Sequence, residues 1–541
     1  MPICRAAQIA HFRDEKETLI GLPPRKPLYS VSMLSQLPNL ARLWLWSMVI
    51  FVLTLWLGTR HNDFPWYYHP DEPGKVEQVL GTRPLNFHHP MLLLNSTKVA
   101  VSLLGVEKNQ QSVVETGRRV SAFFTAAAVV ALSLLGYVWR GWRVALISGL
   151  TLATHHQLYE LSHYMKEDTA LLFGLAVTFL AVHLHQRKPT LRTALFIGLG
   201  VGLAISGKAL GLMALVVAVP VFIATRSQCG WRIVIASAVF AIAIIVAINP
   251  QAVLSMDAVR ESSSREMELA TGGQGMTQSV PHGKYWSVFL SNTTPIMWPL
   301  ILAVIVITWK RRKEHNTAEL ATIGFPFALG IALSFFPKEN DRYFLPATAL
   351  FTVLAAMGAA ELARVLHKKA SRGLLEAGIG TALVLGQFIN WTDDRGGLIR
   401  YDEAFQTDDT TELLVWLNQH SQAGEMIAKD NRVRLPDSRR RSRKARPLPN
   451  KILSAEYAAD LGTLDKLRAD GVSLVIISES TFMRFERAGM RPKEGDGGDA
   501  ERRRAFYAEL RRSYEPAWSR QRSTVIYLHP GIEVYRIAQP N

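Results

Sequence analysis

Two adjacent carboxylates and three histidines are concentrated in one short polar stretch of the chain. Asp71 and Glu72 stand in the sequence His69-Pro70-Asp71-Glu72, and the pair His88-His89 follows shortly afterwards. A carboxylate here could act as a general base on a hydroxyl or amine that attacks an anomeric carbon. Carboxylates and imidazoles together could instead hold a divalent cation on a leaving phosphate. A purely structural alternative is that the two acids only cap the helix that follows them.

Three further charged residues stand at the ends of apolar runs. Asp168 begins one run, Lys208 interrupts the sequence GLAISGKALGL, and Arg342 precedes Tyr343 in ENDRYFLPA. A charge near bilayer depth costs ~2.5–3.5 kcal/mol on insertion scales, so such groups are candidates for function. Lys208 and Arg342 are therefore candidate ligands of a phosphate.

Each of these charges also has a structural interpretation. Lys208 could extend its side chain to the membrane interface, and Arg342 could pair with Glu339 or Asp341. Asp168, or the neighbouring Glu167, could cap a helix. Spacing alone does not choose between these interpretations and the functional ones.

The elements that must position these residues are long apolar helices. The chain has 541 residues, of which 48% are hydrophobic, and many of these stand in runs long enough to cross a membrane. About 20 apolar residues span the ~30 Å hydrocarbon core as a helix. The runs lack the alternation of barrel strands, so we predict a polytopic helical membrane protein. We place about eleven spans at 40–58, 119–138, 143–161, 168–185, 191–206, 209–225, 231–249, 287–309, 320–336, 343–363 and 374–391.

Charges in the short loops predict the orientation. Arginine and lysine are concentrated in alternate loops and in the N-terminal tail, which the positive-inside rule places in the cytoplasm. An odd number of spans then puts the C-terminal region outside. The first span follows a long polar tail and is predicted to be a retained signal anchor. Cys4 and Cys229 both fall on the cytoplasmic side, so no disulfide is expected.

We predict three parts: a cytoplasmic tail 1–39, a transmembrane domain 40–391 and a soluble domain 392–541. The transmembrane part includes an outer loop, 59–118, with an interfacial helix at 90–105, and aromatics such as Trp66, Tyr67 and Tyr68 are expected in the interface belt.

The soluble part is predicted to be a small extracytoplasmic α/β domain. Helices are expected at 409–420, 460–470 and 500–513, a buried strand at VSLVIIS, and a hairpin around His529-Pro530-Gly531 in STVIYLHPGIEVYRIA. The basic tract 437–446 is expected to be a solvated loop, although it could attract lipid headgroups or an anionic acceptor. It lies on the wrong side of the membrane for nucleic acid.

The outer loop resembles that of polytopic glycosyltransferases of the GT-C fold. These include the dolichyl-phosphate-mannose protein mannosyltransferases and the lipid A aminoarabinose transferases. In the family an acid of this loop, commonly in an Asp-Glu pair, is catalytic; Asp71 matches it, with Glu72 beside it. HHPMLLLN resembles the family's next pattern, except that Met91 replaces a common second proline.

Further motifs resemble the family in the same order along the chain, and together they cover about 40–363. SHYMKEDTALLFG corresponds to the second outer loop with Asp168, GLAISGKALGL to a lysine-containing turn with Lys208, and ENDRYFLPA to an Arg-Tyr signature. The resemblance implies transfer of a sugar from a polyprenyl-phosphate donor to a lipid, glycan or protein acceptor, by single displacement with inversion. Asp71, Glu72 and Asp168 are the implied catalytic residues, and the implied substrate ligands are His88, His89, Lys208, Arg342 and Tyr343.

No cofactor is expected, because no nucleotide-binding fingerprint stands in a suitable context. A divalent metal stays open through the histidines but is not favoured. The main alternative function is a transporter or flippase, which would place its polar residues near the bilayer midplane, often in matched repeats. A scaffold that binds a lipid-linked sugar without turning it over is a third. A bacterial inner membrane is the expected location.

Overall fold

The computed structural model describes residues 37–272, 277–279, 284–336, 340–366, 369–389, 397–436, 448–486, 490–492 and 495–537. The chain divides into two units, Met1–Trp46 and Ser47–Asn541. The candidate site and the C-terminal sheet both belong to the second unit. The basic tract 437–446, Cys4 and Glu339 lie outside the described residues.

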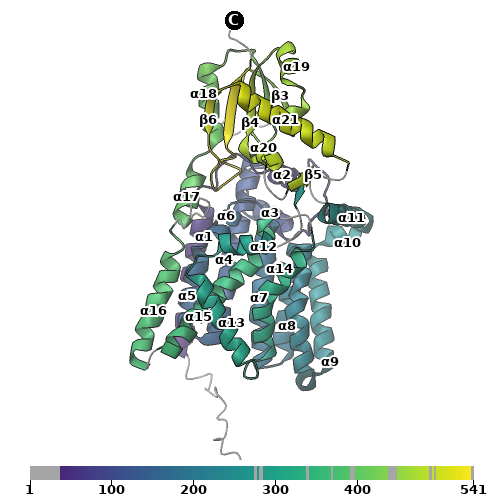
Figure 1. Ribbon diagram of the computed structural model, residues 1–541. Helices are drawn as coiled ribbons and strands as arrows, with labels where there is room; N and C mark the ends of the chain where they lie inside the picture. The colour runs from purple at the N-terminus through teal and green to yellow at the C-terminus, as the bar shows by residue number, and fades with distance from the viewer. Residues whose placement is uncertain are drawn as a thin grey trace, which may run out of the picture. The chain divides into compact units, whose positions relative to one another are not determined.

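Long apolar helices make up most of the second unit (Figure 1). Among the described residues, five helices are long and apolar enough to cross a membrane, or six if the bent pair α12 and α13 is one span. Each predicted apolar run falls on one helix or on two successive helices, which confirms the predicted fold class, while the count of eleven spans stays a prediction. The helices are α1 (Leu37–Thr59), α4 (Gln110–Arg140), α5 (Trp142–Ala153), α6 (His156–Ser162), α7 (Glu167–Arg187), α8 (Leu191–Gly207), α9 (Leu215–Ile248), α12 (Lys284–Asn292), α13 (Met297–Lys310), α14 (Thr317–Leu333), α15 (Leu345–Leu366) and α16 (Lys369–Leu385).

α9 covers two predicted runs and reverses direction between them. Gly230 interrupts it with a non-helical φ of 67° and ψ of 164°. Asn249, just after α9, donates from Nδ2 to Ser206 Oγ at 3.0 Å. Ser206 stands just before the short 3₁₀ helix η2 (Ala209–Ala214) that leads into α9. Because the segment begins and ends at the same place, its two halves must run in opposite directions, as the separate runs predict.

Glycines allow α7 and α8 to pack with their backbones in close approach. A methyl group on Gly174 of α7 would lie 2.1 Å from the backbone nitrogen of Ala204 in α8. One on Gly207 would lie 2.6 Å from the backbone nitrogen of Leu171. Small residues let membrane helices approach in this way. The close packing brings the first turn of α7, with Asp168, next to Lys208 at the end of α8.

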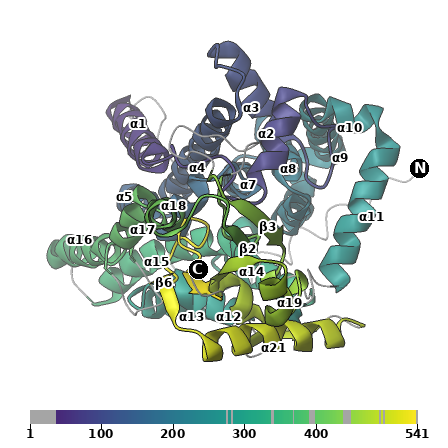
Figure 2. The same ribbon diagram turned by 90° about the horizontal axis from the view of Figure 1, so that it is seen from above.

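The outer loop 59–118 folds over the ends of the helices. It contains α2 (Glu72–Leu80) and α3 (Leu92–Leu103), the latter at the predicted interfacial helix. α10 (Pro250–Leu254) and α11 (Met256–Gly272) follow α9 on the same side (Figure 2).

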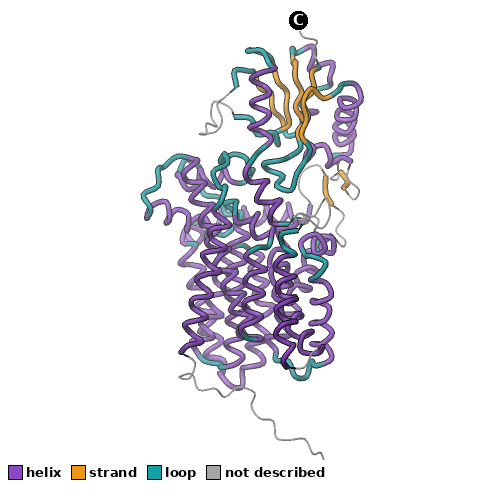
Figure 3. Tube along the Cα trace, turned by 90° about the vertical axis from the view of Figure 1, so that its left-hand side faces the viewer, coloured by secondary structure: helices purple, strands orange, loops and turns teal. Residues whose placement is uncertain are grey.

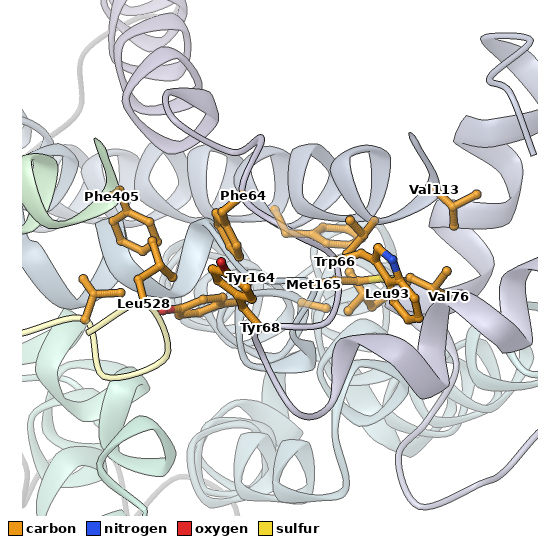
Figure 4. Packing of buried hydrophobic residues seen from close by; sticks show 14 of the residues in the cluster. Phe64, Trp66, Tyr68, Val76, Leu93, Val113, Tyr164, Met165, Phe405 and Leu528 are labelled. Carbon is orange, nitrogen blue, oxygen red and sulfur yellow. The ribbon is translucent and has the colours of Figure 1, made fainter. Parts of the chain in front are cut away.

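Three aromatics of this loop differ from the prediction. Trp66, Tyr67 and Tyr68 are buried in an apolar cluster rather than placed in an interface belt (Figure 4). The cluster also takes in Phe405 and Leu528 from the C-terminal region. The loop therefore has a core of its own, which fixes the residues around Asp71.

The C-terminal domain is built on a five-stranded mixed sheet of order β3-β2-β4-β7-β6, and its strands gather beyond the ends of the helices (Figure 3). β2, β3 and β4 are parallel, and β7 is antiparallel to β4 and β6. The predicted buried strand is β4, and the three predicted helices are α18, α19 and α21. The elements are α17 (Leu398–Gln406), α18 (Asp409–His420), β2 (Met426–Asp430), β3 (Lys451–Ala455), α19 (Leu464–Ala469), β4 (Val472–Ser478), α20 (Glu479–Glu486), α21 (Gly497–Ser513), β6 (Pro516–Arg520) and β7 (Ile532–Arg536), while β5 (Met490–Pro492) pairs with β1 (Thr277–Ser279) in a separate ribbon.

The predicted hairpin around His529 is wrong in its first half. β7 forms as expected, but its partner is β6, and residues 521–531 form a loop at the carboxyl end of β4. Val525 and Leu528 are buried, so the apolar residues of STVIYL serve packing of a loop rather than a strand. Leu528 belongs to the same cluster as Phe64, and the loop therefore reaches the helices.

Candidate active site

Asp71 stands directly before the first residue of α2 and borders a cavity of about 290 Å³. Its side chain is 46% exposed, in contrast to the buried acids around it. Residues from α2, α3, α7, α11 and η3 (Asp341–Phe344) line the cavity. They include Asp71, Lys75, His88, His89, Glu167, Glu266, Arg342 and Tyr343.

Two cations and a histidine hold Asp71 in place. Lys166 Nζ contacts Asp71 Oδ2, and Arg342 Nη2 lies 3.9 Å from the same oxygen. The backbone N–H of Asp71 donates to His69 Nδ1 at 3.1 Å. Burial by itself would raise the pKa of Asp71, but Lys166 and the other nearby positive charges lower it well below its usual range. Asp71 is therefore ionised near pH 7, and it is a weak base as long as these positive charges surround it.

Glu72, predicted to be catalytic beside Asp71, has a different position. Its side chain is fully buried, and Arg118 donates to it from Nε at 3.0 Å and from Nη2 at 2.6 Å. The backbone N–H of Met165 donates to Glu72 Oε1 at 2.9 Å. Both carboxylate oxygens are occupied and neither borders the cavity. Glu72 is a structural anchor, and we correct its assignment.

Asp168, Lys208 and Arg342 form one ion-pair group, as their common side of the membrane predicts. Lys208 Nζ donates to Asp168 Oδ1 at 2.7 Å, and Arg342 Nε lies 3.6 Å from Asp168 Oδ2. Lys208 Nζ also lies 4.3 Å from the centre of the Tyr343 ring. Asp168 is thus not an N-cap, since Lys166 occupies that position of α7. Asp168 is buried and forms ion pairs with both cations, and its predicted catalytic role stays a prediction.

Two lysines of this cluster were not singled out from the sequence. Lys166 contacts Asp71, and Lys75 Nζ donates to Glu167 Oε1 and to the Met165 carbonyl oxygen, both at 2.8 Å. Lys75 also lines the cavity. Their positions in the sequence could have indicated them. Lys75 is one helical turn after Asp71, and Lys166 directly precedes the two acids that open an apolar run.

Both predicted histidine ligands border the cavity. Burial lowers the pKa of His89 to about 4, with Lys208 and other cations acting in the same direction against Glu167. His89 is therefore neutral near pH 7 and can both donate and accept hydrogen bonds. His88 Nδ1 lies 4.0 Å from Glu266 Oε1 of α11.

The cluster combines four basic side chains with three carboxylates. Lys75, Lys166, Lys208 and Arg342 stand with Asp71, Glu167 and Asp168. Asp168 Oδ2 and Arg342 Nε are buried and face each other in the 3.6 Å ion pair, without a hydrogen bond to any residue that the structure describes. A ligand or a water could complete their hydrogen bonding. Within the described ranges, no three His, Cys, Asp or Glu side chains are grouped to hold a metal ion.

Comparison with known proteins agrees with this chemistry. Residues 96–254 match the family model described as dolichyl-phosphate-mannose-protein mannosyltransferase. This match confirms the predicted resemblance and, with it, the enzyme class of a membrane glycosyltransferase. No curated protein matches the chain.

Several solved structures resemble the whole chain or part of it. ArnT from Cupriavidus metallidurans, bound to undecaprenyl phosphate, is 13% identical with a TM-score of 0.49, covering 93% of this chain and 99% of that one. An oligosaccharyltransferase from Archaeoglobus fulgidus is 12% identical with a TM-score of 0.45, covering 79% and 68%. The S. cerevisiae protein O-mannosyltransferase Pmt1-Pmt2 complex, bound to the sugar donor, is 18% identical with a TM-score of 0.34, covering 40% and 34%.

Proposed function

We propose that this protein transfers a sugar from a polyprenyl-phosphate carrier to an acceptor on the non-cytoplasmic face, with Asp71 as the general base. The observation that carries the proposal is the position of Asp71. It is a half-exposed, ionised carboxylate at a cavity that is also lined by three cations, Lys75, Arg83 and Arg342, and two acids, Glu167 and Glu266. Asp71 can take a proton while the cations receive a leaving phosphate.

The donor phosphate is assigned to the Arg342 and Lys208 side of the cavity. Arg342 lines the cavity, and Asp168 forms ion pairs with both Arg342 and Lys208, so the two cations lie close together. Lys75 and the neutral His89 border the same space. Cations held in place before the reaction stabilise the charge that develops on the leaving phosphate.

The transfer then follows from the geometry. Asp71 accepts the proton of the acceptor hydroxyl or amine, whose oxygen or nitrogen forms a bond to the anomeric carbon. The bond between that carbon and the phosphate oxygen breaks, and the phosphate keeps the electron pair. The motif resemblance supports a single displacement with inversion. None of these steps requires a cofactor or metal ion.

The orientation follows the charges of the short loops. Under the positive-inside rule the site and the C-terminal domain lie outside the cytoplasm, in the periplasm if the membrane is a bacterial inner membrane. Polyprenyl chains are membrane-bound, so the donor must reach the cavity from the outer leaflet. The cavity at the ends of α2, α3 and α7 suits that route.

The transporter alternative is less well supported by the site. A transporter usually binds its substrate near the bilayer midplane, between broken helices. Here the cavity is lined by the outer loop, the first turn of α7, α11 and η3.

The test is release of labelled sugar from a short-chain polyprenyl-phosphate hexose by the purified full-length protein. We expect slow hydrolysis by water, and faster release when membrane extract supplies an acceptor. The absence of both with several hexoses and extracts, from folded protein that binds the donor, would leave a transporter or a scaffold.

A further inference from the structure

The β6–β7 loop of the C-terminal domain reaches the candidate active site. The Tyr527 ring lies 4.2 Å from the His69 ring and 5.5 Å from the Tyr164 ring. His69 in turn accepts the backbone N–H of Asp71. A residue of the sheet domain therefore stands next to the histidine that orients the proposed base.

The loop is held firmly in this position. One ring nitrogen of His529 is hydrogen-bonded to Asp409 Oδ1 at 2.8 Å, and the other is hydrogen-bonded to the Ala404 carbonyl oxygen at 2.9 Å. The backbone N–H of Asp409 donates to the Leu528 carbonyl oxygen at 3.0 Å. Burial alone would lower the pKa of His529, but Asp409 raises it, in keeping with two acceptors around the ring. Tyr527 is thus placed by contacts on both sides of it.

α6 and α17 present further side chains toward the same region. His156, Gln157 and Glu160 share one face of α6 by their spacing of three and four residues. On that face, the His156 ring lies 5.1 Å from the Tyr401 ring of α17, and Gln157 Nε2 donates to the Asp341 carbonyl oxygen at 3.3 Å. The α6 face is therefore directed toward α17 and η3.

The Glu160 carboxyl group on this face has few polar contacts. It forms no hydrogen bond or ion pair with the residues that the structure describes, although it interacts electrostatically with Arg342, Tyr164, Tyr401 and Tyr527. The Tyr164 hydroxyl, from a residue that is 1% exposed, also has no hydrogen-bond partner among described residues. Two polar groups in one place thus lack partners, which a bound ligand or water would supply.

This region is separate from the donor cavity. Glu160, Tyr401 and Tyr527 are half-buried, and none of them lines the 290 Å³ cavity. Asp71 and Arg342 line it and also interact electrostatically with Tyr527. Asp71 and Arg342 therefore belong both to the cavity lining and to the surroundings of Tyr527.

We propose that Tyr527, Tyr401 and Glu160 form the acceptor subsite, and that the acceptor is a carbohydrate whose hydroxyl is presented to Asp71. This inference rests on the proposed function and adds the class of the acceptor. Tyrosine rings can cover the C–H faces of a sugar, and a carboxyl group forms hydrogen bonds with its hydroxyls.

The inference can be tested without a donor. Saturation-transfer NMR on the full-length protein in nanodiscs would use mannotriose, maltotriose and chitotriose, with a threonine-containing peptide for comparison. We expect at least one sugar to bind and the peptide not to bind. Tyr527→Ala and Tyr401→Ala should weaken sugar binding about tenfold or more, the size expected for loss of an aromatic contact.

Two variants separate a binding role from a structural one. Tyr527→Phe keeps the ring and should retain sugar binding, and Tyr137→Ala, at a half-buried tyrosine on α4, should leave it unchanged. Binding of undecaprenyl phosphate and hydrolysis of the donor by water are measured in the wild type and in Tyr137→Ala, and both properties should be present in each. If the wild type neither binds undecaprenyl phosphate nor hydrolyses the donor, the proposed function itself is wrong. Three results would overturn the acceptor subsite alone, provided that the wild type still hydrolyses the donor. They are that no sugar binds, that Tyr527→Ala leaves sugar binding unchanged, or that only the peptide binds.

Discussion

Glu72 and Arg118 form a doubly hydrogen-bonded ion pair from which solvent is entirely excluded, with N–O distances of 3.0 and 2.6 Å. Arg118 Nη1 also donates to the carbonyl oxygens of Asn62 and Phe64, at 2.8 and 2.7 Å. The pair fixes the outer loop to α4 at the residue that follows Asp71. The two neighbouring acids thus have different positions: Glu72 anchors the loop, and Asp71 borders the cavity.

Removing Arg118 should be strongly destabilising. Arg118→Ala leaves the Glu72 charge buried and unpaired, which costs about 3–5 kcal/mol of unfolding free energy. Denaturant unfolding in detergent micelles measures the change. The matched control is Arg119→Ala, whose exposed side chain lies 3.9 Å from Glu115 and should cost about 0–1 kcal/mol. Equal losses in the two variants would contradict the anchoring role.

Asp71→Asn should abolish most of the transfer and leave the fold intact. Loss of a general base lowers the rate by roughly 10²–10⁴-fold. The assay is sugar release from the short-chain donor, with binding of undecaprenyl phosphate measured in parallel. Glu77→Gln, an exposed acid of the same helix at 3.6 Å from Arg83, is the control and should keep full activity. If Asp71→Asn retains transfer, the base is another group.

The phosphate assignment predicts a loss of donor affinity. The double variant Lys208→Gln with Asp168→Asn replaces the ion pair by two amides and so avoids an unpaired buried acid. Loss of charge-assisted contacts to a phosphate should weaken binding of short-chain polyprenyl phosphate about 10–100-fold. Lys108→Gln, at an exposed lysine of the outer loop, should have no effect. Unchanged affinity in the double variant would exclude Lys208 from the phosphate site.

Lys166 should give the reaction a pH dependence. Burial, and then Arg342, lower the pKa of Lys166 to about 7, although Asp71 opposes the shift. Above that pH the neutral amine no longer holds the Asp71 carboxylate, whose own pKa then rises, making it a stronger base. We expect kcat/KM to rise as pH increases through about 7. Lys166→Gln, uncharged at every pH, should lose this rise, and an unchanged profile would show that another group titrates.

Gly174→Ala should disturb the site from a distance. The added methyl group would lie 2.1 Å from the Ala204 backbone nitrogen, so α7 and α8 must move apart. Overpacking of this kind costs about 1–3 kcal/mol and would separate Asp168 from Lys208. The temperature of thermal unfolding should fall, and donor binding should weaken. In Gly324→Ala on α14 the methyl group meets no atom within 4 Å, so both properties should be retained.

Local patterns predict a membrane protein better than they predict the small domain. The apolar runs coincide with helices because, in lipid, each helix must satisfy its backbone hydrogen bonds within itself. This requirement concerns consecutive residues, so it is visible in the sequence. The apolar residues of STVIYL resemble a strand, but Val525 and Leu528 are buried in a loop. Only the position of β6 in the sheet decides that this segment has no strand partner.

By itself the sequence determined the helical class, the resemblance to a glycosyltransferase family and the charged residues Asp71, Asp168, Lys208 and Arg342. Those features depend on composition and on motifs of a few adjacent residues. Only the tertiary structure decided that Glu72 faces Arg118, that Lys166 contacts Asp71 and that Tyr527 joins the site. Lys166 and Asp71 are 95 positions apart. Such contacts are made by the packing of whole helices and of the outer loop, so no local pattern contains them.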